Sequence, residues 1–383
     1  MLTPSTGNPV SRQEIRSVRP RLHLSPSRTT DMGKLAYRAY QPEDAEKLSR
    51  LHSSVFGVSR TPVFWHWKYR ANPAGNDLSC VAEDTDTHQI VGENGVIPVR
   101  VGVNGEPVLA CQSVDILVEE EYRRRLVHFE LMARAGHRVM TSRPPLAFTF
   151  AFGEAVTIKV SSAVLGYSTV ALIPRMVKPL SLAPYAPRLL RGAARAADPI
   201  FRSVTRPRKA PPPSGATVQR VAHFDARCDQ FWRQQASRYP VAVWRDSAYL
   251  NWRYLEAPGG DYEAYSMERH GELLGFTVLR PVSLGGRRRG RILELVAAED
   301  DEAIASSLLA HVLSRFGEQQ LEVAVSWVLA SDPLWRGMRR RGFLSRPRQG
   351  RALVVLAHNE TVPHDFLTQA ENWRVSMGDA DEI

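Results

Sequence analysis

The chain has 383 residues, of which 43% are hydrophobic, and a formal net charge of +10. This length suffices for two domains of ordinary size. No run approaches the roughly 18 apolar residues of a membrane-spanning helix, and the start lacks the apolar middle of a signal peptide, so we expect a cytoplasmic protein. Cys80, Cys111 and Cys228 are widely spaced and no Cys/His cluster has zinc-ligand spacing, which predicts reduced thiols and no metal.

The positive charge is carried almost entirely by arginine, since only six of the 50 basic residues are lysine. Such a bias is typical of the codon usage of a GC-rich bacterial genome. We therefore do not expect nucleic-acid binding from the charge alone, although a partner that carries phosphate would suit it.

Residues 1–32 are rich in Ser, Thr, Pro and Arg and have too little apolar surface to fold. They resemble a transit peptide in composition, but we favour a disordered basic tail or an upstream start codon, with Met32 as the true start. The orderly pattern begins at residue 33.

Residues 35–40 suggest a first strand, and a helix follows over 42–56, with Pro42 at its start and Gly57 as its stop. An aromatic and basic segment, FWHWKYR, begins at Phe64. Alternating apolar residues then predict further strands, with Gly95, Asn104-Gly105 and Pro107 as turn material, at 78–83, 90–96, 99–103 and 108–118.

Residues 113–132 organise the first part of the chain. A buried strand (114–118) is followed by an acidic turn (119–121), three arginines (123–125) and a helix that contains Leu131 and Met132. A strand that leads directly into a helix N-terminus favours phosphate, because the free N–H groups and the helix dipole both attract an anion.

This stretch resembles the pyrophosphate loop of the GCN5-related N-acetyltransferases (GNAT), [Q/R]-x-x-G-x-[G/A]. Arg123 matches the first position, and Leu126 and His128 stand where the family has small residues. The resemblance implies acyl-CoA as co-substrate, with its pantetheine on the backbone of one strand and its pyrophosphate on the loop. The residues implied are Ile116, Leu117, Val118, Arg123, Arg124, Arg125, Leu126, Val127 and His128.

Without the glycines, we expect arginine side chains and His128 to hold the phosphates in place of backbone N–H groups. The alternative is a solvated basic helix start on a degenerate domain.

A strand at 146–152 and a helix at 153–167 complete this part, and the order of elements is that of the family. Gly166-Tyr167 matches the end of the family's closing segment, whereas Ala155, Ile158 and Ser162 replace its Asn, Ala and Tyr. The resemblance implies an α/β (α+β) fold with a mixed, mostly antiparallel central sheet flanked by helices.

Residues 179–216 are rich in Pro, Ala and Arg and predict a semi-rigid linker. Residues 187–204 within it have the pattern of a basic amphipathic helix. A peripheral membrane contact is the alternative to a solvated linker helix.

An internal repeat is the strongest signal in the sequence. Trp67-Lys68-Tyr69, Pro73 and Gly75 recur 185 positions later as Trp252-Arg253-Tyr254, Pro258 and Gly260. It predicts two tandem GNAT-like domains, 33–178 and 217–383. In this, and in its closing ENWRVSMGDADEI, the chain resembles the double-domain acyltransferases that accompany bacterial exopolysaccharide genes. In the second unit Glu299, Asp300 and Asp301 would repel a pyrophosphate, so we place the donor site in the first.

Acyl transfer to an amine needs a base, a group that polarises the carbonyl and an acid for the thiolate. Asp115, on the strand that would line the thioester, is the first candidate base, and Glu93 and Glu83 are the second. The alternative for Asp115 is an acid on the solvent face of a strand. Tyr167 is a candidate acid, unless it belongs to the core.

Trp65, His66, Trp67 and Tyr69 are candidates for binding the acceptor, because aromatic rings beside cations stack on sugars and bases. The recurrence of the W-[KR]-Y motif in both units favours packing under a loop. Trp65 and His66, which the second unit replaces with Leu250 and Asn251, are the better functional candidates.

Together these features predict an N-acyltransferase that moves an acyl group, acetyl first, from CoA to an amine of a sugar, amino acid or small metabolite. One alternative changes the donor to acyl-carrier protein or aminoacyl-tRNA. Another is a non-catalytic binding or scaffold protein.

Overall fold

The computed structural model describes residues 35–154, 165–205 and 210–381. Its strands are β1 (Leu35–Ala39), β2 (Cys80–Asp84), β3 (Ile90–Val103), β4 (Glu106–Val118), β5 (Phe148–Gly153), β6 (Ser168–Pro179), β7 (Ala216–Val221), β8 (Val241–Val243), β9 (Glu263–Arg269), β10 (Glu272–Leu284), β11 (Arg287–Ala297), β12 (Val323–Trp327), β13 (Leu344–Ala357) and β14 (Trp373–Arg374). Its α-helices are α1 (Ala45–Phe56), α2 (Pro62–Tyr69), α3 (Val127–Met140), α5 (Arg191–Thr205), α6 (Ala226–Ala236), α7 (Ser247–Leu250), α8 (Glu302–Glu318), α9 (Leu334–Arg340) and α10 (His364–Leu367).

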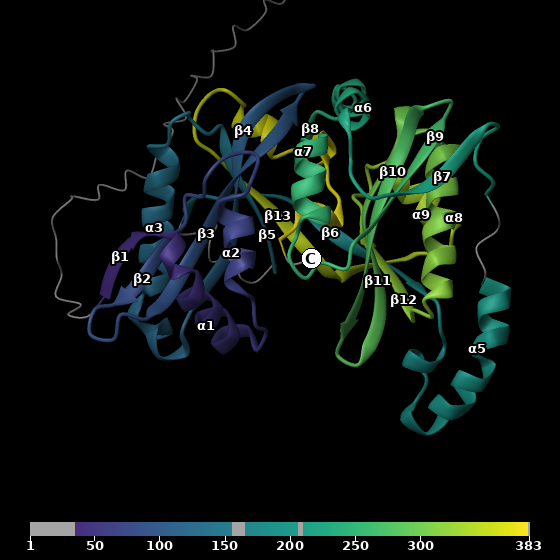
Figure 1. Ribbon diagram of the computed structural model, residues 1–383, viewed down its shortest axis with the longest axis horizontal. Coiled ribbons are helices and arrows are strands. Elements are labelled where there is room, and N and C mark those ends of the chain that lie inside the picture. The colour runs from purple at the N-terminus through teal and green to yellow at the C-terminus, as the bar shows by residue number, and fades with distance from the viewer. Residues whose placement is uncertain (1–34, 155–164, 206–209, 382–383) are drawn as a thin grey trace, which may run out of the picture. The chain divides into compact units, whose positions relative to one another are not determined.

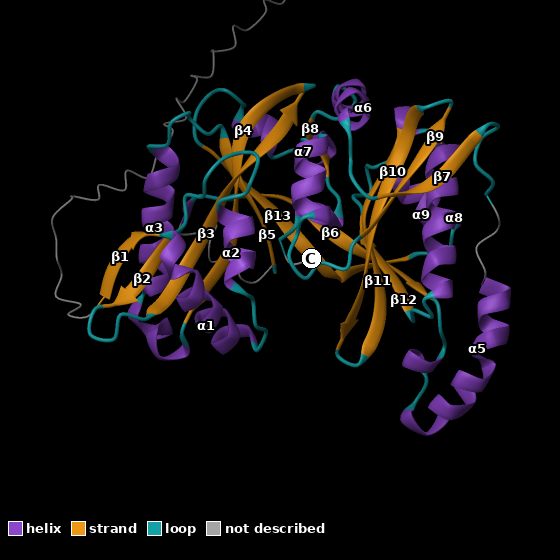
Figure 2. Cartoon of the chain, in the orientation of Figure 1, coloured by secondary structure: helices purple, strands orange, loops and turns teal. Residues whose placement is uncertain are grey.

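The strands form one mixed sheet, in which most neighbours are antiparallel. Its order is β1-β2-β3-β4-β5-β13-β6-β12-β11-β10-β9-β7, and β8 and β14 attach beside β3. Figure 2 shows the strands spread from β1 on one side to β7 on the other, with helices around them. The predicted fold class, a mixed and mostly antiparallel sheet flanked by helices, is confirmed.

The order of strands is the same when it is followed inward from either edge. β1-β2-β3-β4-β5 on one side corresponds to β7-β9-β10-β11-β12 on the other. We call residues 35–179 the N-terminal half and residues 216–381 the C-terminal half.

Two strands cross between the halves at the centre of the sheet (Figure 1). β6, from the N-terminal half, pairs with β12, and β13, from the C-terminal half, pairs with β5; β6 and β13 also pair with each other. Because each half completes the sheet of the other, the described residues from Leu35 onward form one compact unit.

Helices cover both faces of the sheet in the N-terminal half. Successive side chains of β2 point to opposite faces, so both faces have apolar residues to bury. Val81 packs in one core cluster with Leu48 and Leu51 of α1, and Cys80 and Ala82 pack in another with Val127 and Leu131 of α3. Gly92 permits the close approach of α3, since a Cβ there would lie 2.9 Å from Leu131 Cδ1. Gly275, which repeats Gly92, does the same for α8, with Leu308 Cδ1 at 3.1 Å.

The repeated tryptophans meet where the halves join. Trp67 Nε1 donates to the Trp252 carbonyl (2.7 Å), and Trp252 Nε1 donates to the Trp67 carbonyl (2.9 Å). The two rings stack with centroids 5.2 Å apart. The repeat therefore produces a reciprocal contact, and both indole N–H groups are satisfied although both rings are buried.

Most predicted elements of the N-terminal half are confirmed. α1 ends at Gly57 in the left-handed conformation (φ +68°), and Asn104-Gly105 forms the turn between β3 and β4. The predicted break at Gly95 is wrong: residues 90–103 form one strand, with a bulge beside Gly95. The predicted tail (1–32) and most of the helix at 153–167, with Ala155, Ile158 and Ser162, lie outside the described residues.

The Trp67–Trp252 contact predicts a large loss of stability on truncation. Trp252→Ala removes a buried ring and leaves the Trp67 indole without its stacking partner, so we expect the free energy of unfolding to fall by about 3–5 kcal/mol in urea denaturation. Val63→Ala, at a side chain that is 63% exposed, is the control and should change stability by less than about 0.5 kcal/mol. Equal effects of the two changes would contradict a structural role for the contact.

Candidate active site

β4 separates from β5 before either strand ends. The two strands pair in parallel at Cys111–Thr149 and Gln112–Phe150, and β4 then continues to Val118 paired with β3. A bulge at Asp115, whose φ is +38°, accompanies the separation. Among the described strands, residues 113–118 therefore have no partner on their β5 side, and the backbone groups that face this side are left without a strand partner.

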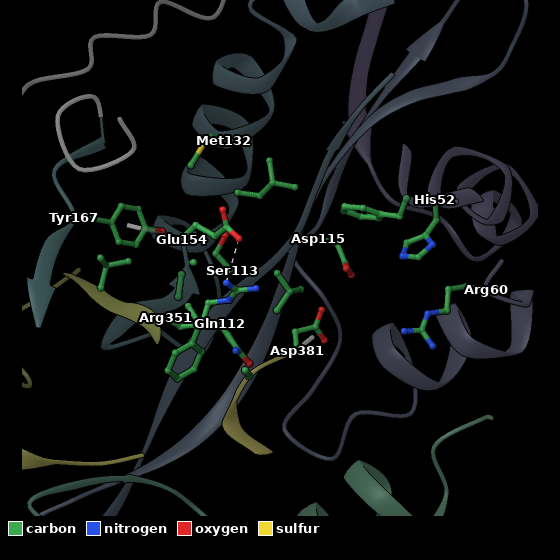
Figure 3. A pocket seen from close by; sticks show the side chains of 18 of the residues that line it. His52, Arg60, Gln112, Ser113, Asp115, Met132, Glu154, Tyr167, Arg351 and Asp381 are labelled. Atoms are coloured by element: carbon green, nitrogen blue, oxygen red, sulfur yellow. Dashed lines mark hydrogen bonds and ion pairs between the residues drawn. The ribbon is translucent and has the colours of Figure 1, made fainter. Parts of the chain in front are cut away.

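A cavity of about 680 Å³ occupies the space that this separation opens. Its walls come from β4, β5, the ends of α1 and α2, α3, β13 and the last described residues (Figure 3). The polar and charged side chains in these walls are those of His52, Arg60, Gln112, Ser113, Asp115, Glu154, Tyr167, Arg351 and Asp381.

A buried ammonium group lies behind Asp115. Lys68 on α2 has a side chain that is 1% exposed, and its Nζ donates to Asp115 and to Asp381 Oδ2 (2.6 Å). Burial alone would lower the pKa of Lys68, but the two carboxylates outweigh it and raise that pKa. One cation thus serves two carboxylates, and with both ionised the group has one net negative charge beside the cavity.

The two carboxylates of this group differ in their environments. Burial raises the pKa of Asp115 against the attraction of Lys68. For Asp381, burial is outweighed by Lys68 and then Arg253, and the pKa is lowered. Asp115 is therefore the better proton acceptor of the two near neutral pH.

Glu93 lies deeper than Asp115 and does not line the cavity. It is fully buried, and the Tyr69 hydroxyl lies 2.5 Å from its Oε1 and 3.2 Å from Asp115 Oδ2. Burial, together with the charge of Asp115, raises the pKa of Glu93 well above its usual value and favours the neutral acid. Glu93 and Tyr69 thus support Asp115 from behind.

The loop after β4 has the backbone that the glycine-containing pattern requires. Leu126, at the first glycine position, has φ +59°, in the left-handed region, and α3 begins at the next residue. No side chain caps the start of α3. Its first N–H groups therefore lack a capping carboxylate, and Leu126 is 66% exposed.

The start of α8, the corresponding helix of the C-terminal half, is capped by a side chain. The Asp301 side chain accepts hydrogen bonds from the N–H groups of Ala303 (2.7 Å) and Ile304 (2.9 Å). A smaller cavity of about 410 Å³ lies there and has Asp300, Glu302 and Asp332 in its wall. The two helix starts thus differ in charge in the direction that the sequence predicted.

The basic residues of the predicted phosphate loop are placed in part. Arg123 is exposed, and its Nε donates to the Val118 carbonyl (3.1 Å). Burial lowers the pKa of His128, so that it offers a neutral N–H rather than a charge. Arg124 and Arg125 belong to the turn Glu120–Arg125, and their side chains lie outside the described part. Ile116 lines the cavity, whereas Leu117 and Val127 are buried and do not line it.

The other predicted residues divide between the cavity and the core. Tyr167 lines the cavity, and burial raises the pKa of its hydroxyl. Glu83 lies on β2 in an ion pair with Arg38 (2.8 Å) and is not in the cavity wall.

The aromatic segment on α2 lies mostly in the core. Trp65 and Trp67 are buried, and His66 is exposed; none of them lines the cavity. Tyr69 touches the site through Asp115.

Several residues of the cavity wall were not predicted from the sequence, among them His52, Arg60 and Asp381. His52 could have been recognised from the sequence, because it follows Leu48 by one helical turn and therefore lies on the buried face of α1. Asp381 had an indirect signal: Lys68 lies in the repeated W-[KR]-Y motif, and a buried cation needs an acidic partner from another part of the chain. Arg60 had no signal in the sequence.

Comparison with known proteins agrees with this geometry. Residues 36–159 match the family model of the acetyltransferase (GNAT) domain. Saccharomyces cerevisiae N-myristoyltransferase with bound myristoyl-CoA is similar in structure, with a TM-score of 0.60 and 12% identity over 87% of this chain and 81% of that one. A GCN5-related N-acetyltransferase from Anabaena variabilis has a TM-score of 0.60 and 11% identity over 85% of this chain and 74% of that one.

The chain therefore has the fold of the GNAT acyltransferases. A third similar structure, a probable N-acyltransferase from *Enterococcus faecalis*, has a TM-score of 0.57 and 12% identity over 84% of this chain and 72% of that one. A search of curated proteins found no significant match.

Among residues 35–154, 165–205 and 210–381, no group of three or more His, Cys, Asp or Glu side chains could hold a metal ion. Within the same ranges, no helix is both long and apolar enough to cross a membrane.

Glu93→Gln tests whether this acid is buried in its neutral form. The folded-state pKa of Glu93 lies well above the unfolded value of about 4.3, so the stability that its protonation contributes is complete below that value and is lost as pH rises toward the folded pKa. Gln cannot ionise, so the variant does not lose stability in this way as pH rises. We expect the variant to gain stability over the parent, and the gain to grow between pH 5 and pH 8 in urea unfolding.

Glu83→Gln is the matched control with the opposite sign. Arg38 lowers the pKa of Glu83, so its ion pair contributes stability above the unfolded pKa, and that contribution fades as pH falls. This variant should lose stability at pH 8 and lose less near pH 4. A Glu93→Gln gain that is constant with pH would contradict a neutral Glu93.

Proposed function

We propose that the protein is an N-acyltransferase that moves an acyl group from a CoA thioester to an amine. The observation that carries this proposal is the unpaired edge of β4, which lies beside a cavity and leads to an uncapped helix start. A pantetheine has amides that would pair with that edge, and its pyrophosphate would meet the start of α3. No other helix start described here joins these features.

The donor site belongs to the N-terminal half in this proposal, and the C-terminal half contributes to the acceptor side. Support comes from Asp301, which occupies the start of α8, and from Ala380 and Asp381, which bring the C-terminal half into the cavity wall. The internal repeat and the matching strand order support a tandem of two GNAT-like domains, divided as the sequence predicted.

Asp115 is the proposed base. The amine nitrogen would attack the thioester carbonyl carbon, forming the C–N bond as the C–S bond breaks. The nitrogen would lose a proton toward Asp115, whose raised pKa suits this role. Tyr167, which lines the cavity beyond β4, would protonate the departing thiolate.

Among donors, CoA thioesters are favoured over an acyl-carrier protein or aminoacyl-tRNA. The uncapped start of α3 and the cavity beside β4 suit the pyrophosphate and pantetheine of CoA. The length of the acyl chain is open, and one similar fold is that of an enzyme solved with myristoyl-CoA, so acyl-CoAs from acetyl to myristoyl belong in any assay.

The asymmetry between α3 and α8 gives a test of the donor site. Leu126→Asp places a carboxylate at the start of α3, as Asp301 does for α8, and should repel the pyrophosphate. Leu126 is 66% exposed and Asp tolerates its left-handed backbone, so folding should be retained. We expect the Kd for acyl-CoA, measured by calorimetry, to rise at least about tenfold, or about 1.4 kcal/mol.

Leu126→Asn is the matched control, because it has the same shape without the charge. It should bind acyl-CoA much as the parent does. Unchanged binding by Leu126→Asp would place the phosphates elsewhere. If the parent protein binds no acyl-CoA from acetyl to myristoyl, a carrier-linked donor or a scaffold without chemistry becomes the better account.

The proposed base is tested by Asp115→Asn. Lys68 keeps Asp381 as its partner in this variant, so the fold should survive. We expect kcat to fall by about 10²–10⁴, with the Kd for acyl-CoA unchanged. Glu154→Gln, in the same cavity wall, is the control and should retain most activity. A kcat near that of the parent in Asp115→Asn would remove this residue from the mechanism.

A further inference from the structure

The cavity has a wall away from the proposed donor site that the proposed reaction does not yet explain. It is formed by His52 and Phe56 near the end of α1, Val58 and Arg60 in the connection that follows, and Phe64 on α2. We call these five residues the Arg60 wall. In Figure 3, His52 and Arg60 lie on one side of Asp115, and Tyr167, Glu154 and Arg351 lie on the other.

Arg60 is a cation without a counter-ion in the described structure. Its Nε is buried and has no hydrogen-bond acceptor, and its guanidinium lies over the Phe64 ring, 4.4 Å from the centroid. The other charged groups of the cavity are partnered: Arg351 pairs with Glu154 (3.2 Å), and Asp115 and Asp381 share Lys68. A guanidinium held flat on a ring is well placed to bind a carboxylate.

His52 fixes the connection that carries Arg60. Its Nδ1 lies 2.7 Å from the Val58 carbonyl oxygen. A carbonyl only accepts, so Nδ1 carries the hydrogen, and in the neutral ring Nε2 keeps a free lone pair. Because His52 lines the cavity, its ring offers an amine N–H a hydrogen-bond acceptor on the same side as Arg60.

The charges of the cavity are therefore separated in a defined way. With both carboxylates ionised, the group of Asp115, Asp381 and Lys68 has one net negative charge, and Arg60 supplies an unpaired positive charge across from it. Arg253 adds a weaker attraction to Asp381, while its own hydrogen bonds go to the carbonyls of Gly378 and Ala380. A molecule with an amine at one end and a carboxylate at the other matches this arrangement.

We propose that the Arg60 wall is the acceptor site and that Arg60 binds a carboxylate of the acceptor, which makes the acceptor an amino acid. Its amine would lie beside Asp115 and His52, and its side chain would pack toward Phe56 and Val58. This inference rests on the proposed acyltransferase function and narrows its acceptor from any amine to a zwitterion.

The test compares amino acids with their amides, which retain the amine and side chain but lack the carboxylate. Phenylalanine, leucine, alanine and glutamate, each with its α-amide, are titrated into the protein saturated with CoA, and are also assayed as acceptors with acyl-CoA. We expect at least one acid to bind about tenfold or more tighter than its amide. Arg60→Gln should abolish that preference and leave the Kd for acyl-CoA unchanged, and Arg60→Lys should retain part of it.

Arg70→Gln is the matched control. Arg70 also has a buried, unpartnered Nε and lies near an aromatic ring, that of Tyr40, but it does not line the cavity. This variant should keep the preference for the acid. Equal binding of every acid and its amide, or a preference that survives Arg60→Gln, would overturn the proposal.

Failure of the proposal and failure of the acyltransferase function give different results. Arg60-dependent binding of an amino acid without acylation by any acyl-CoA would support the Arg60 site and overturn the function. Acylation of amines that ignores the carboxylate would support the function and overturn the Arg60 site.

Discussion

Buried cations of both halves hold the last described segment, and one of them, Lys68, joins that segment to the N-terminal half. Lys68, Arg245 and Arg253 are all buried, and a buried charge without a partner is costly. Residues 376–381 supply the partners: Asp381 bonds to Lys68 (2.6 Å), Asp379 bonds to Arg245 (2.6 Å), and the carbonyls of Gly378 and Ala380 accept from Arg253. The last described segment is thereby held between the repeated motifs of both halves. The same contact brings Asp381 into the cavity wall, so stability and the charge of the site have one origin.

The two halves have the same strand order, but the N-termini of their corresponding helices, α3 and α8, differ. The edge of β4 is free beyond Gln112, and α3 begins without a capping side chain, whereas Asp301 caps α8. A single carboxylate in this place both stabilises its helix and excludes an anionic ligand. In the proposed function, this contrast is the physical reason to place one donor site in the N-terminal half, and β13 and residues 376–381 of the C-terminal half would shape the acceptor side.

Local patterns predicted much of this fold, and pairing between distant residues set the rest. Strand alternation, Gly57 and the strand-to-helix stretch at 113–132 gave β1 to β5, α1 and α3, because these depend on near neighbours. The exchange of β6 and β13 had no local signal, since each strand finds its partner in the other half. In the site, Asp115 and Tyr167 were found through a motif. Lys68 stood in a recognised repeat, but its meaning appeared only when Asp381, more than 300 positions away, proved to be its partner.

The proposed function depends on one binding event, in which a CoA thioester would lie between β4 and β5, at the start of α3. The most direct measurement is a crystal structure of the full chain soaked with CoA. We expect pantetheine amides hydrogen-bonded to the backbone of residues 113–118, the pyrophosphate at the N–H groups that begin α3, and no CoA at α8. CoA bound at α8 instead, or crystals in which the β4–β5 cavity stays empty at saturating CoA, would contradict the account.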